Sequence, residues 1–206
     1  MKNKKNDQQK FWAGKFGKEY VSRNSIQRLS KNSIALFSKI FINKIPPKEC
    51  LEFGANIGAN LLAFKTLFPK IKTCGVEINK YAFQHLAKII GKNNSYNQSI
   101  ESFKKNKKYD LVFTKGVLIH INPENLNKIY EKLFKMSKKY ILIIEYYNPK
   151  PVKISYRGHS DKLFKRDFAG EIMKKYKSLK LIDYGFIYHG DLSFPQDDLT
   201  WFLLEK

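Results

Sequence analysis

Residues 51–61 read Leu51-Glu52-Phe53-Gly54-Ala55-Asn56-Ile57-Gly58-Ala59-Asn60-Leu61. A short apolar run ends here in a glycine turn, and a helical pattern follows it directly. Glycine lets the backbone approach a ligand closely and lets the next helix begin tightly. This segment therefore predicts a strand, a ligand-binding turn and a helix in direct succession.

The same alternation continues along the chain. Strands are expected over 50–53, 73–78, 96–100, 109–114, 140–145, 180–188 and 200–204, and helices over 25–43, 59–68, 80–90, 123–136 and 165–176. Asn122 is expected to cap the helix that begins at Pro123. The almost wholly apolar strand 140–145 is expected to be buried on both faces. This order predicts an α/β, Rossmann-like fold with a mostly parallel seven-stranded sheet and helices on both faces.

The N-terminal region differs from the rest. Residues 1–10 read as a tail, and residues 11–24 read as an ordered loop or a short helix. The expected organisation is one compact domain, in which residues 1–45 form a tail and a helical cover and residues 46–206 form the ligand-binding part. Ligands of such sheets bind beyond the carboxyl ends of the strands.

The charge of the chain is strongly positive: 39 Lys and Arg against 18 Asp and Glu give +21 over 206 residues. Basic domains often bind nucleic acid. However, counting along the chain gives 35 Lys and 4 Arg. Arginine reads phosphates and bases better than lysine does, and the lysines are spread throughout. The surplus of Lys, Asn and Ile is typical of an A/T-rich genome, so nucleic acid is disfavoured. A basic face for a polyanion stays open.

From the apolar patterning we expect neither a membrane span nor a signal peptide. No run of 18 apolar residues predicts a membrane span, and the first ten residues lack the apolar core of a signal peptide. Cys50 and Cys74 each begin an apolar run, which favours reduced thiols. We therefore expect a cytoplasmic protein without membrane partners.

The glycine turn excludes two common ligand classes. Aligned on Gly54, a dinucleotide site requires glycine at positions 56 and 59, where Asn56 and Ala59 stand. No Gly-Lys-Ser/Thr of a P-loop follows. The turn instead resembles the acidic-x-Gly-x-Gly-x-Gly loop of class I S-adenosylmethionine (SAM)-dependent methyltransferases. Glu52, Gly54 and Gly58 fit that loop, and Asn56 replaces its middle glycine, which is tolerable because Asn accepts left-handed backbone angles.

The second strand ends at Glu77, 77 − 52 = 25 residues after Glu52. An acidic residue near this distance can accept hydrogen bonds from both hydroxyls of a ribose. The alternative is an acid that stabilises the N-terminus of the next helix. The methyltransferase resemblance implies that Ser99 and the N–H of Ile100 meet the adenine. The expected cofactor site also includes Ala55, Ile78, Thr114 and Lys115.

The fourth strand and its turn narrow the class of methyltransferase. A strand over 109–114 followed by a turn ending in His120 is common in class I enzymes that act on small molecules. DNA and RNA amino-methylating enzymes carry Asp/Asn-Pro-Pro-Tyr/Phe at this place. Asn148-Pro149 follows the fifth strand, which is the wrong place. His120 is either a general base or a structural histidine at the next helix, since methyl transfer needs mainly alignment.

Polar residues gather after the fifth strand. Tyr146, Arg157 and Asp161 are expected to bind an acidic acceptor, and His159 to assist proton removal. The alternative for residues 154–168 is a polar surface loop. A metal site on His159 and Asp161 would need a repeating ligand spacing that the chain lacks, so no metal is predicted.

Several runs together resemble one family, the pseudaminic acid biosynthesis-associated methylases. These runs are FWAGKFGKEYVSRN (11–24), residues 51–61, DLVFTKGVLIHINPENL (110–126), SYRGHSDKLFKRDFAGEI (155–172) and FPQDDLTWFLLEK (194–206). The resemblance covers about residues 11–206. It implies a cytoplasmic bacterial enzyme that works beside the biosynthesis of a nine-carbon acidic sugar of surface glycans.

From this resemblance we expect methyl transfer from SAM to a hydroxyl or amine of an acidic sugar, free or nucleotide-activated, with S-adenosylhomocysteine (SAH) as product. Tyr20, Arg23 and Asn24 of the cover are expected at the cofactor, where Arg23 would bind the methionine carboxylate bidentately. Two alternatives stay open: a methyltransferase that acts on RNA or protein, and a non-catalytic cofactor-binding partner in glycan assembly. The sequence leaves the oligomeric state open.

Overall fold

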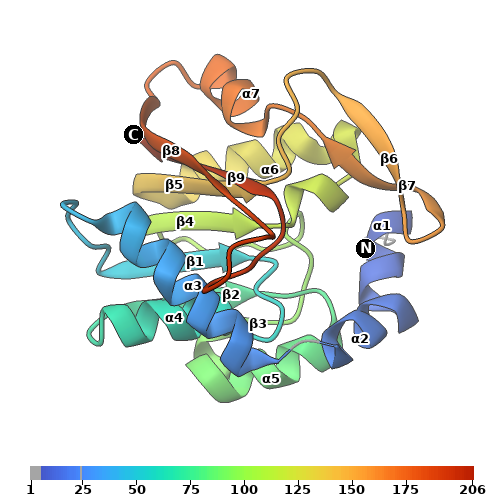
Figure 1. Cartoon of the computed structure of the whole chain (residues 1–206), viewed down its shortest axis with the longest axis horizontal. Coiled ribbons are helices and arrows are strands. Elements are labelled where there is room, and N and C mark those ends of the chain that lie inside the picture. Colours follow the sequence, from blue (N-terminus) through green and yellow to red (C-terminus); the bar gives the residue numbers. More distant parts are fainter. Residues whose placement is uncertain (1–5, 24) are drawn as a thin grey trace. The chain divides into compact units, whose positions relative to one another are not determined.

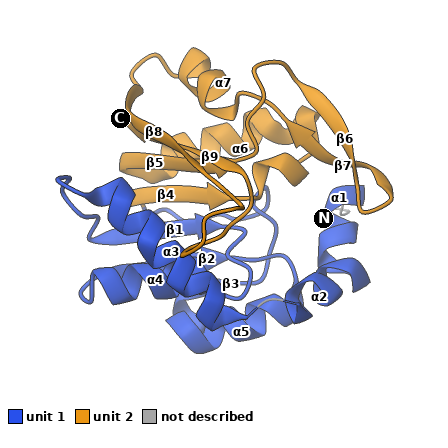
Figure 2. Cartoon of the chain, viewed as in Figure 1, with its two compact units in different colours: residues 1–107 blue, residues 108–206 orange. Residues whose placement is uncertain are grey.

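The computed structural model describes residues 6–23 and 25–206. The chain divides into two compact units, Met1–Lys107 and Lys108–Lys206 (Figure 2). Along the sheet the strands follow the order β3-β2-β1-β4-β5-β9-β8. The predicted mostly parallel seven-stranded sheet with alternating strands and helices is therefore confirmed.

Unit 1 begins with helices and continues as a strand–helix repeat (Figure 1). Its elements are α1 (Asp7–Ala13), α2 (Lys15–Ser22), α3 (Ile26–Phe41), β1 (Glu49–Phe53), α4 (Ala59–Leu67), β2 (Lys72–Val76), α5 (Lys80–Ile90), the short 3₁₀ helix η1 (Lys92–Asn94) and β3 (Ser95–Tyr96). Strand β2 pairs in parallel with both β1 and β3. The third strand is shorter than its predicted range, 96–100.

Residues 1–10 were expected to form a tail, and this prediction was wrong for residues 7–10, which belong to helix α1. Helix α1 begins at Asp7 because Asn6 caps it: Asn6 Oδ1 accepts a hydrogen bond from Gln9 N at 2.8 Å. The Gln9 side chain returns a bond to Asn6 N at 3.2 Å, which completes a capping box.

The core of unit 1 is aromatic and tightly packed. Phe37 of α3 and Phe64 of α4 are fully buried, and their rings stack with centroids 4.2 Å apart. Leu51 and Phe53 of β1 are equally buried. Burying such side chains stabilises the fold by about 1.5–3 kcal/mol each. This packing fixes helices α3 and α4 and leaves the end of β1 to carry the glycine turn.

Unit 2 contains β4 (Tyr109–Lys115), the 3₁₀ helix η2 (Leu118–His120), α6 (Pro123–Met136), β5 (Ser137–Glu145), β6 (Val152–Tyr156), β7 (His159–Lys165), α7 (Phe168–Lys175), β8 (Lys180–Ile187) and β9 (Leu199–Glu205). Strands β4 and β5 are parallel, whereas β9 runs antiparallel to β5 and β8. Residues 140–145 are buried, as predicted. Asn122 caps α6 through Glu124 N at 3.0 Å, also as predicted.

Residues 152–165 form an antiparallel β-hairpin, β6–β7, where a non-periodic polar segment was expected. The hairpin also moves the start of the following helix. The helix predicted from residue 165 begins at Phe168, since Asp167 Oδ1 caps it through Gly170 N at 2.8 Å. Strand β7 contacts η2. The hairpin therefore lies beside the turn that carries His120.

Cys50 and Cys74 are buried free thiols on the paired strands β1 and β2. None of the helices in the described parts of the chain is long and apolar enough to cross a membrane.

Candidate functional site

The glycine turn after β1 has three residues in left-handed backbone conformations. The φ angles are 73° at Gly54, 47° at Asn56 and 88° at Gly58. The N–H groups of Gly54 and Ala55 both donate to the Val76 carbonyl, at 2.8 and 3.0 Å, which anchors the turn to the end of β2. Asn56 thus adopts the backbone angles expected of the glycine that it replaces.

Glu77 lies directly beyond β2 and is buried. Its Oε2 accepts a hydrogen bond from Asn56 N at 2.8 Å, and its Oε1 accepts one from Asn79 N at 2.7 Å. Burial raises the pKa of Glu77, and these backbone N–H groups oppose that rise. An ionised carboxylate offers about four lone-pair positions, so two bonds leave room for a ligand's hydroxyl groups.

The side chain of Asn56 provides a test of whether a ligand fits here. Its Oδ1 atom is buried and makes no hydrogen bond to the described residues. A buried acceptor without a partner costs about 1–3 kcal/mol. A ligand with an ammonium or hydroxyl donor at the turn would remove this cost, so the residues of the turn fit a polar cofactor such as SAM.

Glu52 belongs to strand β1. It is almost fully buried, and its Oε1 accepts a hydrogen bond from Asn60 Nδ2 at 2.6 Å. Asn60 Oδ1 in turn accepts one from Ser33 Oγ at 2.7 Å. This chain of bonds links β1 to α4 and α3. The predicted cofactor role of Glu52 stays a prediction.

Asn79 joins the N-terminal cover to the end of β2, and the sequence reasoning missed it. Its Oδ1 caps α5 by accepting from Tyr81 N and Ala82 N, at 3.0 and 3.1 Å. Its Nδ2 donates to the Trp12 carbonyl at 2.9 Å. A Cβ on Gly17 would lie 2.7 Å from Asn79 Nδ2, so only glycine permits this approach. An Asn directly before a helical pattern is the signal that could have found it.

The cover also packs against the glycine turn itself. Val21 of α2 belongs to a small apolar cluster with Ile57 and Ala59 at the turn and Ala82 of α5, flanked by Ile26 and Leu29. Helices α1 and α2 are therefore held near Glu77, α2 by this apolar cluster and α1 by the Asn79 side chain.

The other predicted cofactor residues of unit 1 lie at different depths. Tyr20 is half-buried and meets the Trp12 ring edge-on, with centroids 5.5 Å apart. Arg23 is exposed at the C-terminus of α2, and Asn24 lies outside the described residues.

Ser99 and Ile100 follow β3, together with a residue that the sequence reasoning missed. Ser99 Oγ accepts a hydrogen bond from Ser102 N at 3.2 Å, and Ile100 is buried. Asn97 Nδ2 donates to the carbonyls of Glu77 and Ile78 at 2.9 and 3.2 Å, which fixes the backbone at the end of β2.

Unit 2 carries a second buried carboxylate at the end of a parallel strand. Glu145 ends β5, and its two oxygens accept from Val117 N at 3.0 Å each, from Leu118 N at 3.0 Å and from Ile119 N at 3.4 Å. Burial raises its pKa to about 7. Glu145 therefore holds the turn between β4 and His120.

His120 is buried on η2, and its Nδ1 lies 2.6 Å from the Lys162 carbonyl of β7. A carbonyl only accepts, so Nδ1 carries the proton and Nε2 is the basic nitrogen. Burial lowers the pKa of His120 from 6.5 to about 4. The imidazole is therefore neutral at physiological pH, and it is a weak base.

The remaining predicted residues lie along unit 2 at different depths. Thr114 is buried, and its Oγ1 makes no hydrogen bond to the described residues. Lys115 Nζ donates to Gln196 Oε1 at 2.7 Å. Tyr146 is half-buried beneath Lys165, whose Nζ lies 4.8 Å from the ring centroid.

Three predicted acceptor residues are exposed on the β6–β7 hairpin. Arg157 and His159 lie at its tip, and Asp161 forms an ion pair with Lys153 across the hairpin. The Arg157 guanidinium lies 5.8 Å from the Tyr156 ring centroid. In the described parts of the chain, no three His, Cys, Asp or Glu side chains are arranged to hold a metal ion.

Comparison with known proteins identifies the fold. No protein-family model and no curated protein matches the sequence. Magnesium protoporphyrin IX methyltransferase from Synechocystis PCC 6803, solved with bound SAM, matches with a TM-score of 0.68 and 11% identity, covering 100% of both chains.

Two further solved structures agree. The 1,6-didemethyltoxoflavin-N1-methyltransferase of Burkholderia thailandensis, with bound SAH, gives a TM-score of 0.68 and 11% identity, over 92% of this chain and 82% of that one. A SAM-dependent methyltransferase of Leishmania major gives 0.68 and 17%, over 98% and 87%. The chain therefore has the Rossmann-like fold of class I SAM-dependent methyltransferases, as its glycine turn predicts.

Proposed function

We propose that this protein is a SAM-dependent methyltransferase whose acceptor is an acidic sugar, of the nonulosonic or pseudaminic type, in bacterial surface glycan biosynthesis. The cofactor half of this proposal rests on the turn of unit 1. There, three left-handed residues surround a buried Glu77 that keeps accepting capacity and an Asn56 oxygen that lacks a partner among the described residues. Neighbours of the same fold were solved with SAM or SAH bound.

The residues of unit 1 would hold the cofactor by complementary chemistry. Glu77 would accept from the ribose hydroxyls, and Asn56 Oδ1 from the ammonium of the methionine part. The backbone of Ala55, Gly58 and Ile78 would follow the cofactor, and Ser99 and Ile100 would border the adenine. Arg23 would pair with the methionine carboxylate. Bound SAM supplies an electrophilic methyl group.

The N-terminal cover would exclude water from this cofactor. Tyr20 and Trp12 form an aromatic layer, and Asn79 ties their segment to the end of β2. Excluding water strengthens the electrostatic contacts inside a site and prevents hydrolysis of the donor. Asn79 therefore couples the cover to the carboxylate that would bind the ribose.

The residues of unit 2 would act on the acceptor. His120, neutral at physiological pH, would accept a hydrogen bond from the attacking hydroxyl or amine at Nε2. Its low pKa limits proton removal, so alignment of the nucleophile would supply most of the rate. Thr114, Lys115 and Tyr146 would border the acceptor, with Arg157, His159 and Asp161 on the hairpin. The acidic-sugar part rests on the family resemblance of residues 155–172 and 194–206.

Isothermal titration with SAH tests the cofactor half. We expect a dissociation constant in the micromolar range. Glu77→Gln should weaken binding at least tenfold, because a charge-assisted hydrogen bond contributes about 1.5–3 kcal/mol. Glu124→Gln, an exposed acid in the first turn of α6, is the matched control and should leave the affinity unchanged. Unchanged SAH affinity in folded Glu77→Gln would contradict the site.

Transfer of labelled methyl from SAM to a panel of nucleotide-linked nonulosonic and amino sugars tests the acceptor half. We expect labelled product with an acidic nine-carbon sugar and none with neutral hexoses. Intact SAH binding without transfer to any acidic sugar would contradict the acceptor class and leave the cofactor assignment standing.

A further inference from the structure

Arg166 is the one arginine of the four in the chain that is not exposed, and all four lie among the described residues. It follows β7 directly and precedes the Asp167 cap of α7. Its side chain is 19% exposed, whereas Arg157 at the tip of the hairpin is exposed. A long cationic side chain at this depth needs a partner to hold its charge.

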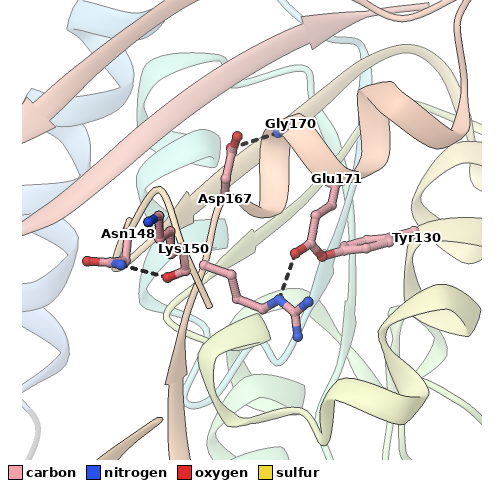
Figure 3. Close-up of polar contacts among 7 residues, drawn as sticks. Tyr130, Asn148, Lys150, Asp167, Gly170 and Glu171 are labelled. Carbon is pink, nitrogen blue, oxygen red and sulfur yellow. Dashed lines mark hydrogen bonds and ion pairs between the residues drawn. The ribbon is translucent and has the colours of Figure 1, made fainter. Parts of the chain in front are cut away.

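Glu171 and Tyr130 hold this guanidinium in one orientation. Arg166 Nε donates to Glu171 Oε1 at 2.7 Å, and Tyr130 OH donates to Glu171 Oε2 at 2.7 Å (Figure 3). Both carboxylate oxygens are therefore engaged. Tyr130 is 2% exposed on α6, and Glu171 lies on α7. Residues of helices α6 and α7 thus hold the Arg166 guanidinium in place.

The contact uses only one edge of the guanidinium. The bond to Glu171 runs through Nε, and the two Nη atoms make no hydrogen bond or ion pair to the described residues. Those two atoms form the fork that binds a carboxylate or phosphate with two parallel hydrogen bonds. Because the fork is already oriented, less side-chain entropy is lost when an anion binds.

The surroundings of Arg166 favour an anion. Residues 146–166 contain six Lys and Arg and one Asp, so this segment carries 6 − 1 = +5 charges. Lys165, the preceding residue, places its ammonium over the Tyr146 ring, next to the end of β5. The carboxyl ends of parallel strands are where ligands of such sheets bind.

The same strand also contacts His120. Lys162 of β7 accepts the His120 Nδ1 hydrogen bond, and Arg166 follows four residues later. Four residues of extended chain span roughly 13 Å.

We propose that Arg166, positioned by Glu171 and Tyr130, binds the carboxylate or phosphate of the acceptor through its two Nη atoms. This inference deepens the proposed function and rests on it. It assigns the specific anion contact to Arg166, and it leaves the exposed Arg157 a supporting role at the hairpin tip. Glu171 and Tyr130 are positioning residues.

Binding of three probes to the protein, measured with and without SAH, tests this assignment. N-acetylneuraminate offers a carboxylate, its methyl ester offers the same sugar without the charge, and cytidine monophosphate offers a phosphate. We expect Arg166→Gln to weaken binding of at least one of the two anions at least tenfold, and to leave the methyl ester unaffected. The anion that loses affinity identifies the source of the oxyanion.

Two further variants sharpen the test. Arg28→Gln removes the same charge from an exposed position on α3 and should change each affinity less than about twofold. Arg166→Lys keeps the charge and a contact to Glu171 but loses the fork, so an intermediate loss is expected. This variant keeps the inference testable if Arg166→Gln fails to fold.

Several results would overturn the inference. These are unchanged affinity for both anions in Arg166→Gln, an equal loss in Arg28→Gln, a loss in Arg157→Gln alone, or no anion binding to the native protein at millimolar concentration. SAH is titrated separately. Normal SAH binding together with unchanged anion affinity in Arg166→Gln contradicts only this inference. A loss of anion affinity in Arg166→Gln, found in a protein that does not bind SAH, contradicts the proposed function instead.

Discussion

Replacing His120 with asparagine should change how the stability of the protein depends on pH. The asparagine amide nitrogen stands at the same number of bonds from Cα as Nδ1, so it can donate to the Lys162 carbonyl as the imidazole does. It cannot titrate. The variant therefore removes the ionisation of His120 and keeps the hydrogen bond that holds η2 to β7.

The magnitude follows from the lowered pKa. The pKa of His120 is about 4 in the folded chain and 6.5 as the reference for the unfolded chain. Between these values the unfolded chain binds more protons, so the native protein loses stability as the pH falls. Linkage gives a loss of about 2 kcal/mol from pH 7.5 to pH 5 that the variant does not show.

Urea unfolding of both proteins at pH 7.5 and at pH 5 measures this difference. The comparison must be made between proteins, since Glu145, with its pKa raised to about 7, changes stability in the opposite direction over part of the range. His85→Asn in unit 1 controls for the general effect of the replacement. A difference in unfolding free energy between native protein and His120→Asn that is the same at both pH values would refute the reasoning.

Other perturbations address the packing and the site. Between pH 5 and pH 8 the native protein should lose about 2 kcal/mol of unfolding free energy that Glu145→Gln does not lose, because the Glu145 carboxyl group binds more protons in the folded chain than in the unfolded chain. Urea unfolding of both proteins at the two pH values measures this difference. Phe37→Ala should cost about 3–5 kcal/mol in thermal or urea unfolding, since Phe37 is fully buried against Phe64. Gly58→Ala should cost about 1–2 kcal/mol, because φ is 88° there. Asn79→Asp keeps the cap of α5 but loses the donor to Trp12, so hydrogen exchange should quicken in α1 and α2 and not in α5.

The strand–helix repeat could be predicted because the spacing of apolar residues clearly distinguishes its helices from its strands. Helices α5 and α6 begin and end at the predicted residues, since each has an Asn cap before a clear 3.6-residue apolar period. Residues 140–144 of β5 are apolar and buried, as the run of apolar residues predicts. In these segments the local pattern and the tertiary packing give the same result.

The hairpin β6–β7 could not be predicted for the opposite reason. Most of its side chains are exposed, so no apolar alternation marks its strands. The pairing depends instead on cross-strand contacts such as Lys153 with Asp161. The contacts that hold Arg166 could not be predicted either, because Glu171 and Tyr130 lie on α7 and α6 and become neighbours only in the folded chain.

Glu77 and Glu145 are similar buried carboxylates that differ in how many hydrogen bonds they accept. Each is a buried carboxylate at the end of a parallel strand, and each accepts N–H groups from the turn that follows another strand of the same unit. Glu145 receives four such contacts, which occupy the roughly four lone-pair positions of a carboxylate.

The Glu77 carboxylate accepts one hydrogen bond from the backbone N–H of Asn56 in the glycine turn and one from the backbone N–H of Asn79, which leaves accepting capacity on both oxygens. Burial raises the pKa of both carboxyl groups, so each gains from further donors. Of these two carboxylates, Glu77 can accept further donors, as the proposed contact with a ribose requires, whereas Glu145 is already saturated by the backbone N–H groups of Val117, Leu118 and Ile119. The two glutamates therefore differ in hydrogen-bond saturation rather than in burial or residue type, and this difference supports the proposal for Glu77.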